Sequence, residues 1–174
     1  IEKKWGVWWE EHLQRKVISE MWKNIRPKAE IFDIKPPKLG QVYDDAQWFN
    51  QIEYNEEIIV NYWDVGAHWN YADFLKHTRN RNADGAIPAY KHFHPHMLGS
   101  TNYAFMREKH QWMLEIQEKK PFTDNRMDEY ASSGTYYFKP GSYVNKYFKM
   151  LTNLDWDLKG EYYVSMIYNL IYQY

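Results

Sequence analysis

The sequence contains no cysteine, so disulfide bonds and thiolate metal sites are excluded. Nothing in it indicates an oxidising compartment, and we expect a cytoplasmic protein. No apolar run approaches the roughly 20 residues that a helix needs to cross a bilayer, so we expect no membrane association. Neither sign of charge dominates, because 22 Lys and Arg stand against 23 Asp and Glu. This balance argues against a surface for nucleic acid.

The start of the chain lacks an initiator methionine and lacks the apolar segment of a signal peptide. We therefore expect the chain to begin inside a longer protein. Its 174 residues suit one domain, and with no internal repeat or linker we predict a single domain over 1–174. Aromatic residues are abundant at 19%, which favours an aromatic-rich core. Exposed aromatics would leave a homo-oligomer as an open alternative.

Strand and helix patterns alternate through the first half of the sequence. Short apolar runs predict strands, and apolar residues three and four positions apart predict helices. The predicted strands are 4–9, 29–34, 57–62 and 84–90, and the predicted helices are 10–25, 41–50 and 70–81. Such alternation predicts parallel strands joined by crossover helices.

The second half has a different pattern, typical of an antiparallel extension of the sheet. The predicted strands are 102–107, 111–117 and 130–139, with a turn at 108–110, and the predicted helices are 142–151 and 161–172. The sequence therefore predicts an α/β fold with a mixed sheet that is flanked by helices and extended by antiparallel strands.

A carboxylate follows the strand predicted at 57–62. Asp64 comes directly after the segment Asn61-Tyr62-Trp63, and ligands of open α/β sheets bind outside the carboxyl ends of the strands. Hard cations such as Mg²⁺ take oxygen ligands, so Asp64 is a candidate metal ligand. Alternatively, Asp64 caps the loop or the helix that follows it.

Four segments together resemble the sugar-phosphate nucleotidyltransferases, also called nucleotide-sugar pyrophosphorylases, which have a Rossmann-like fold of the glycosyltransferase-A type. They are Leu39-Gly40-Gln41, Asn61-Tyr62-Trp63-Asp64, Glu118-Lys119-Lys120-Pro121 and Ser132-Ser133-Gly134-Thr135-Tyr136-Tyr137-Phe138. Two further segments, 79–90 and 93–99, resemble a bacterial subgroup found among capsule and surface-polysaccharide genes.

The resemblance implies an enzyme that joins a nucleoside triphosphate to a sugar phosphate, or a related small phosphate, and releases pyrophosphate. Mg²⁺ would be its cofactor. Asp64 would hold the metal and take part in catalysis, and Lys119 would approach the incoming phosphate. Glu118 would hydrogen-bond sugar hydroxyls, and Gly134 would leave room for the sugar ring.

The resemblance also assigns a base-binding turn and a second metal ligand. Gly40 and Gln41 would lie beside the nucleobase. Many members have Thr-Asp near the C-terminal helix, where this chain has Ser165-Met166, so Glu161 is the nearest acidic substitute.

One element of the family is missing from the sequence. Members begin with a Gly-rich loop whose backbone amides cradle the triphosphate, and this chain has no such loop. We expect a first βα unit of roughly 30 or more residues to precede Ile1.

Three alternatives stay open on the sequence alone. The first is a glycosyltransferase of similar fold that uses a nucleotide-sugar donor, and the second is a non-catalytic module that binds a sugar or a partner. The third concerns His92, His94 and His96, which alternate in sequence. A polar loop is the simpler interpretation of these residues, because a structural zinc site wants four defined ligands.

Overall fold

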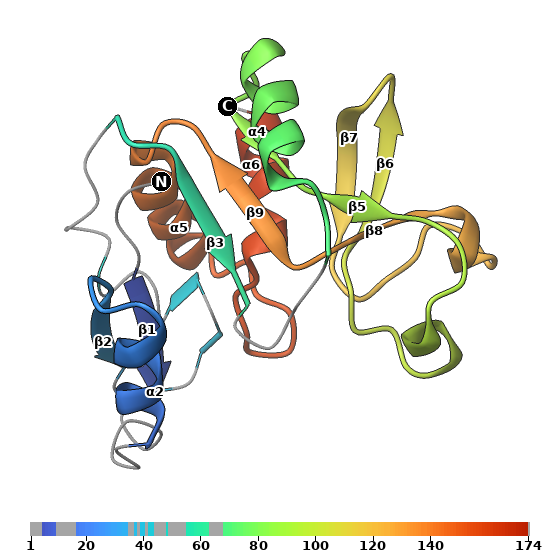
Figure 1. Cartoon of the computed structure of the whole chain (residues 1–174). Coiled ribbons are helices and arrows are strands. Elements are labelled where there is room, and N and C mark those ends of the chain that lie inside the picture. The colour runs from blue at the N-terminus through green and yellow to red at the C-terminus, as the bar shows by residue number, and fades with distance from the viewer. Residues whose placement is uncertain are drawn as a thin grey trace.

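The computed structural model describes residues 5–9, 17–34, 37, 39–40, 42–43, 48, 55–62 and 68–173 (Figure 1). Most of the helix predicted at 41–50 and the first part of the one predicted at 10–25 lie outside these residues. Within them, no helix has both the length and the apolar character needed to cross a membrane.

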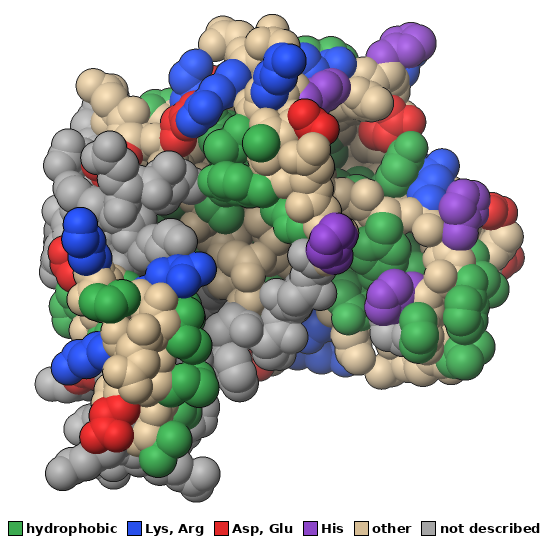
Figure 2. Space-filling model, viewed as in Figure 1, with side chains coloured by type: hydrophobic (Ala, Val, Ile, Leu, Met, Phe, Trp, Pro, Cys, Tyr) green, Lys and Arg blue, Asp and Glu red, His purple; other side chains and the backbone are tan. Residues whose placement is uncertain are grey.

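The first elements form a parallel βαβ unit at one end of the molecule (Figure 1). Strand β1 (Trp5–Trp9) pairs in parallel with β2 (Glu30–Ile34), and helix α2 (Val17–Ile25) connects them. This confirms the parallel pairing predicted for the first two strands. The apolar stripe of α2 does not enter the core as the spacing predicts, because Val17, Met21 and Ile25 are 71%, 50% and 52% exposed. Figure 2 shows hydrophobic side chains along this end of the surface.

A three-stranded sheet follows, and its middle strand comes from late in the sequence. Strand β9 (Thr135–Phe138) lies between β3 (Ile58–Asn61) and β4 (Gly85–Ala86) and runs antiparallel to both. The parallel pairing predicted for 57–62 and 84–90 is therefore wrong, because β9 separates the two strands. Strand β3 is only partly buried, whereas its run of Ile and Val predicts a strand buried in the sheet.

Strand β9 is buried on both faces. Successive side chains of a strand point to opposite faces, and here Phe138 packs against Phe148 while Tyr137 packs against Phe74. These partners come from α5 (Ser142–Asn153) and α4 (Tyr71–Asn80). Helix α6 (Val164–Gln173) packs beside α5 and closes the main core.

The antiparallel extension predicted for the second half is confirmed as a four-stranded sheet. Its order is β5 (Ala89–Tyr90), β8 (Tyr130–Ser132), β6 (Phe105–Lys109) and β7 (Trp112–Gln117), and two 3₁₀ turns lie at Pro95–Leu98 and Arg126–Asp128. The turn predicted at 108–110 lies at His110 and Gln111, which both have positive φ. That geometry suits a tight hairpin turn, so β6 continues through Lys109.

The strands predicted at 84–90 and 130–139 each break into two. Ala86 pairs with Tyr137, and Ala89 pairs with Ser132. Two residues lie between Ala86 and Ala89, but four lie between Ser132 and Tyr137, so the two strands cannot stay in register. Pro88 lies opposite the break and has no N–H to donate, while its carbonyl accepts the N–H of Ser133 at 3.0 Å. Irregularities of this kind bend a strand and redirect its side chains.

Candidate functional site

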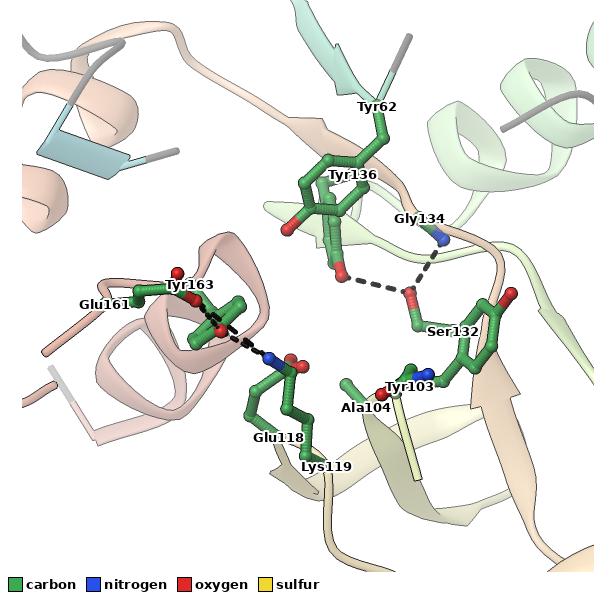
Figure 3. A pocket seen from close by; sticks show the side chains of 11 residues that line it. Tyr62, Tyr103, Ala104, Glu118, Lys119, Ser132, Gly134, Tyr136, Glu161 and Tyr163 are labelled. Atoms are coloured by element: carbon green, nitrogen blue, oxygen red, sulfur yellow. Dashed lines mark hydrogen bonds and ion pairs between the residues drawn. The ribbon is translucent and has the colours of Figure 1, made fainter. Parts of the chain in front are cut away.

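A cavity of about 350 Å³ opens where β7 ends and where the chain passes from β8 to β9. The segment that precedes α6 forms its third side (Figure 3). Four of the seven predicted site residues line it, namely Glu118, Lys119, Gly134 and Glu161. The fold therefore brings together residues that are up to 43 positions apart in sequence, from Glu118 to Glu161.

Glu118 lies at the end of β7 and is held by α6. Its carboxylate accepts a hydrogen bond from the hydroxyl of Ser165. Burial raises the pKa of the Glu118 carboxyl, and the Ser165 hydrogen bond and the Lys119 charge partly offset that rise. One turn along α6, the Asn169 amide accepts from the Ile116 N–H at 3.1 Å and donates to the Ile116 carbonyl at 2.8 Å. Helix α6 thus fixes both the backbone of β7 and the carboxylate that follows it.

Lys119 has an unusual backbone conformation and a crowded side chain. Its φ is +55°, a value that few residues other than glycine adopt, and its N–H donates to the Tyr103 carbonyl at 3.1 Å. The ammonium lies 4.4 Å from the centre of the Tyr163 ring and donates to the hydroxyl of the same residue. Among the described residues that line the cavity, Lys119 carries the one positive charge.

The carboxylate of Glu129 holds the loop after Lys120 in place through hydrogen bonds. Glu129 is buried, and it accepts from the Phe122 N–H at 2.8 Å and from the N–H and hydroxyl of Thr123, each at 2.6 Å. Three such bonds hold the chain just beyond Lys119, which explains how an exposed connection keeps the lysine at the mouth of the cavity.

Glu161 lies on the same side of the cavity as Glu118 and Lys119 (Figure 3). Its carboxylate accepts from the Tyr163 hydroxyl and lies 4.0 Å from the Lys119 ammonium. Burial and this bond raise the pKa of Tyr163. As an oxygen donor at the cavity, Glu161 fits a role as a Mg²⁺ ligand, whereas the buried thioether of Met166 does not. The described residues contain no cluster of three metal-binding side chains.

The opposite wall is neutral and buried. Gly134 has a φ of +77°, which suits glycine, and its N–H donates to Ser132 Oγ at 3.1 Å. The Tyr136 hydroxyl lies 3.2 Å from the same oxygen. Ser132 and Tyr136 were not predicted as site residues, although their even spacing from Gly134 within one strand-like segment is a signal that marks them in the sequence. Tyr62, Tyr103 and Tyr163 also line the cavity. Tyr62 belongs to the segment 61–64 that carries the family resemblance, whereas no sequence pattern marks Tyr103 or Tyr163.

The remaining predicted residues lie away from the cavity or outside the described residues. Gly40 is not among the lining residues; it has a φ of +94° and lies against the backbone of the segment before α6. A Cβ at this position would meet the backbone nitrogen of Tyr162 at 2.7 Å, so glycine is required here for packing. Gln41 and Asp64 lie outside the described residues, and their roles stay predictions.

The three histidines lie in the loop around the 3₁₀ turn at Pro95–Leu98. His92 has a φ of +72°, and the ring of His94 packs 5.4 Å from that of Tyr90. The turn at Pro95 removes the regular alternation that an extended chain would give. Among the described residues the histidines join no metal-binding group.

No protein-family model and no curated protein matches the sequence. Solved structures do match its fold. A nucleoside-diphosphate-sugar pyrophosphorylase from Vibrio cholerae RC9 is similar at 17% identity with a TM-score of 0.71, over 98% of this chain and 68% of that one. A protein described as a glucose-1-phosphate thymidylyltransferase from Bacillus anthracis, in complex with sucrose, is similar at 15% identity with a TM-score of 0.69, over 97% of this chain and 63% of that one.

These similarities confirm the predicted fold class. The chain has a mixed α/β fold of the glycosyltransferase-A type that nucleotidyltransferases share. It spans about two thirds of the length of both proteins, since it covers 68% of one and 63% of the other.

Proposed function

We propose that this chain forms the sugar-phosphate side of a nucleotidyltransferase site that makes a nucleotide-sugar, or a related activated small phosphate, for surface polysaccharide. The observation that carries the proposal is the meeting of Glu118, Lys119 and Gly134 in one cavity. The sequence resemblance assigns all three to the sugar phosphate, and they come from two segments that are separated in sequence. The shared fold supports the same assignment.

The chemistry requires positioning and positive charge more than covalent help from the protein. A phosphate oxygen of the sugar phosphate attacks the α-phosphorus of the triphosphate. The bond from that phosphorus to the bridging oxygen breaks, and pyrophosphate leaves. Lys119 would neutralise the attacking phosphate, and an ionised Glu118 would accept hydrogen bonds from sugar hydroxyls. The absence of a side chain at Gly134 would let the sugar ring approach the backbone.

Mg²⁺ would supply charge neutralisation at the phosphates when it is bound. Asp64 and Glu161 are the residues that we propose to hold it. Glu161 would have to leave its present partners, Lys119 and Tyr163, to do so. The same movement would free the Lys119 ammonium to meet an incoming phosphate.

The test mixes the protein with glucose 1-phosphate, MgCl₂ and each of the common nucleoside triphosphates in turn. Release of pyrophosphate that requires both substrates and the metal would support the proposal. Transfer or hydrolysis from a nucleotide-sugar without any such release would favour a glycosyltransferase instead. Calorimetric binding of glucose 1-phosphate with no turnover of either kind would indicate a binding module.

A further inference from the structure

Arg126 holds a loop from an earlier part of the chain. Its guanidinium donates hydrogen bonds to the carbonyl oxygens of Met97 and Gly99, the latter at 2.8 Å, and to the hydroxyl oxygen of Thr101 at 3.3 Å. All three acceptors belong to the segment 97–101. Within the described part of the chain, no carboxylate pairs with Arg126. The hydrogen bonds of this charged group therefore serve one loop.

This arrangement depends on the shape of the arginine side chain. A guanidinium is planar and offers five N–H donors in a fixed fork, so one group can bind several acceptors and fix them relative to one another. Hydrogen bonds from a charged donor are also stronger than those between neutral groups. The ammonium of a lysine has the same charge but lacks the planar fork. Arg126 is therefore well suited to hold the segment 97–101 in one shape.

The loop that Arg126 holds runs directly into the cavity. It continues into Tyr103 and Ala104, which line the cavity and lie between Lys119 and Ser132 in Figure 3. The Tyr103 carbonyl accepts the N–H of Lys119 at 3.1 Å, and the Ala104 carbonyl accepts the N–H of Ser132 at 2.9 Å. The backbone after the loop thus joins the lysine at the mouth of the cavity to the strand on its other side.

Asn102 offers a polar group to a ligand at this edge of the cavity. It lines the cavity and is exposed. Within the described residues its side chain has no hydrogen-bond partner, and Arg126 holds the residue immediately before it, Thr101. A side-chain amide carries two donors and an acceptor, so it suits a sugar hydroxyl or a phosphate oxygen. A backbone that is already fixed lowers the cost of ordering such a group when a ligand binds.

We propose that Asn102 is a ligand-binding residue of the cavity and that Arg126 is the positioning residue that places it. Arg126 itself does not line the cavity, so its effect passes through the backbone of the segment 97–104. That backbone sets the Asn102 amide directly and sets Lys119 through the Tyr103 carbonyl. The inference rests on the proposed function only in taking glucose 1-phosphate as a ligand of this cavity.

The first test needs no ligand and measures hydrogen exchange of the Lys119 amide in the free protein. This N–H is bonded to the Tyr103 carbonyl, so its exchange reports local opening at this point. Arg126→Ala should speed the exchange about tenfold, because the bonds that hold the loop are lost. Arg126→Lys should do nearly the same, because it keeps the charge without the fork. An unchanged rate in Arg126→Ala would overturn the positioning role.

Arg81→Ala is the matched control. The Arg81 guanidinium donates to the His110 carbonyl at 3.0 Å and lies 4.3 Å from the centre of the Trp112 ring, so it also holds a turn through a backbone carbonyl. None of these three residues lines the cavity. Arg81→Ala should lower the urea midpoint, as Arg126→Ala does, and leave the exchange at Lys119 unchanged. Equal acceleration in both variants would mean that a general loss of stability is responsible, and it would refute the specific role of Arg126.

The second test measures calorimetric affinity for glucose 1-phosphate. Asn102→Ala should lower the affinity about tenfold, because a hydrogen bond to the ligand is lost. Arg126→Ala should lower it at least as much, and the double variant should bind no more weakly than Arg126→Ala, because the amide is already misplaced. Arg81→Ala should bind as wild type does. Losses that multiply in the double variant would show that Asn102 and Arg126 act independently and would refute the coupling.

The two tests also separate this inference from the proposed function. Faster exchange at Lys119 in Arg126→Ala, in a protein that never binds glucose 1-phosphate, would keep the positioning of the loop by Arg126 and overturn the proposed function. Normal affinity in Asn102→Ala and Arg126→Ala, in a protein that binds glucose 1-phosphate and releases pyrophosphate, would overturn the inference and leave the function standing. Asn102 is exposed, so Asn102→Ala tests the ligand contact even if Arg126→Ala does not fold.

Discussion

The two walls of the cavity are built in different ways. The wall from β8 and β9 is neutral and buried, and its geometry is set by the backbone at Gly134 and by hydroxyls with internal partners. The wall at the end of β7 and before α6 is charged, and its side chains are partly exposed: that of Lys119 is 34% exposed and that of Glu161 is 52% exposed.

The neutral wall therefore determines the shape of the cavity, and the charged wall supplies its charges. The buried wall cannot move without disturbing the core, because Tyr136 also belongs to the central strand. The charged wall holds side chains that contact one another and can exchange those contacts for a ligand. Substitutions in the neutral wall should therefore affect stability and binding together, and substitutions of the partly exposed Lys119 and Glu161 should affect binding alone.

Gly134→Ala should produce the largest effect. A Cβ at a φ of +77° strains the backbone by about 1–2 kcal/mol, and because Gly134 lines the cavity, we expect the added methyl group to crowd a bound ligand as well. Misplacing the ligand should cost about a hundredfold in activity. Gly160→Ala is the control, because Gly160 has a φ of +81° and nothing lies within 4 Å of the added carbon. Equal loss of activity in both variants, measured beside their urea midpoints, would mean that strain alone is responsible.

Lys119→Ala should have the second-largest effect, because it removes the positive charge of the charged wall. Removal of the ammonium should weaken glucose 1-phosphate binding about ten- to a hundredfold, because hydrogen bonds between charged groups are the strong ones. Nucleotide binding and thermal stability should change little. Lys120→Ala, at the exposed neighbouring position, is the comparison. Unchanged calorimetric affinity for glucose 1-phosphate in Lys119→Ala would remove this residue from the site.

Glu161→Gln should have an intermediate effect, and it distinguishes a role of Glu161 as a Mg²⁺ ligand from a role as a counterion of Lys119. If Glu161 holds Mg²⁺, the metal concentration for half-maximal pyrophosphate release should rise several-fold, because a neutral amide is a weaker ligand. An unchanged Mg²⁺ requirement with tighter binding of glucose 1-phosphate would instead show that Glu161 serves only as a counterion that competes for Lys119.

The smallest effect concerns the pH dependence of stability. Burial raises the pKa of Glu118, so the folded protein holds this proton more tightly than the unfolded chain does. The corresponding stability is present at low pH, and it is lost as pH rises from the ordinary glutamate value of about 4.3 through the raised one. Urea midpoints of wild type should fall across this window relative to those of Glu118→Gln. Parallel curves for the two proteins would contradict the raised pKa.

Local sequence patterns predicted where helices and strands lie along the chain better than they predicted which strands pair with one another. The apolar spacing predicted α4 and α5 close to their observed bounds. It could not show that β9 inserts between β3 and β4, because a strand pattern says which residues are extended and not which strand lies beside them. The start of α6 was placed three residues early, at 161 instead of 164, because Tyr162 pairs its backbone with Leu39 and stays extended.

The charged wall could be predicted from the sequence and most of the neutral wall could not. Glu118 and Lys119 stand together in a motif, whereas Tyr103 and Tyr163 come from separate parts of the chain and reach the cavity only through the fold. Local sequence patterns also did not predict which apolar stripes are exposed. The apolar stripes of α2 and α5 have the same spacing, but the stripe of α5 is buried and no residue of α2 is fully buried.

By itself the sequence determined the composition of the site: which carboxylates, which lysine and which glycines the chain has to offer. Only the tertiary structure decided which of these groups meet, since α6 brings Ser165 to Glu118 across 47 positions of sequence. The physical reason is that hydrogen bonds and burial depend on distance in space. A buried hydroxyl takes whichever partner the packing of the core places within reach.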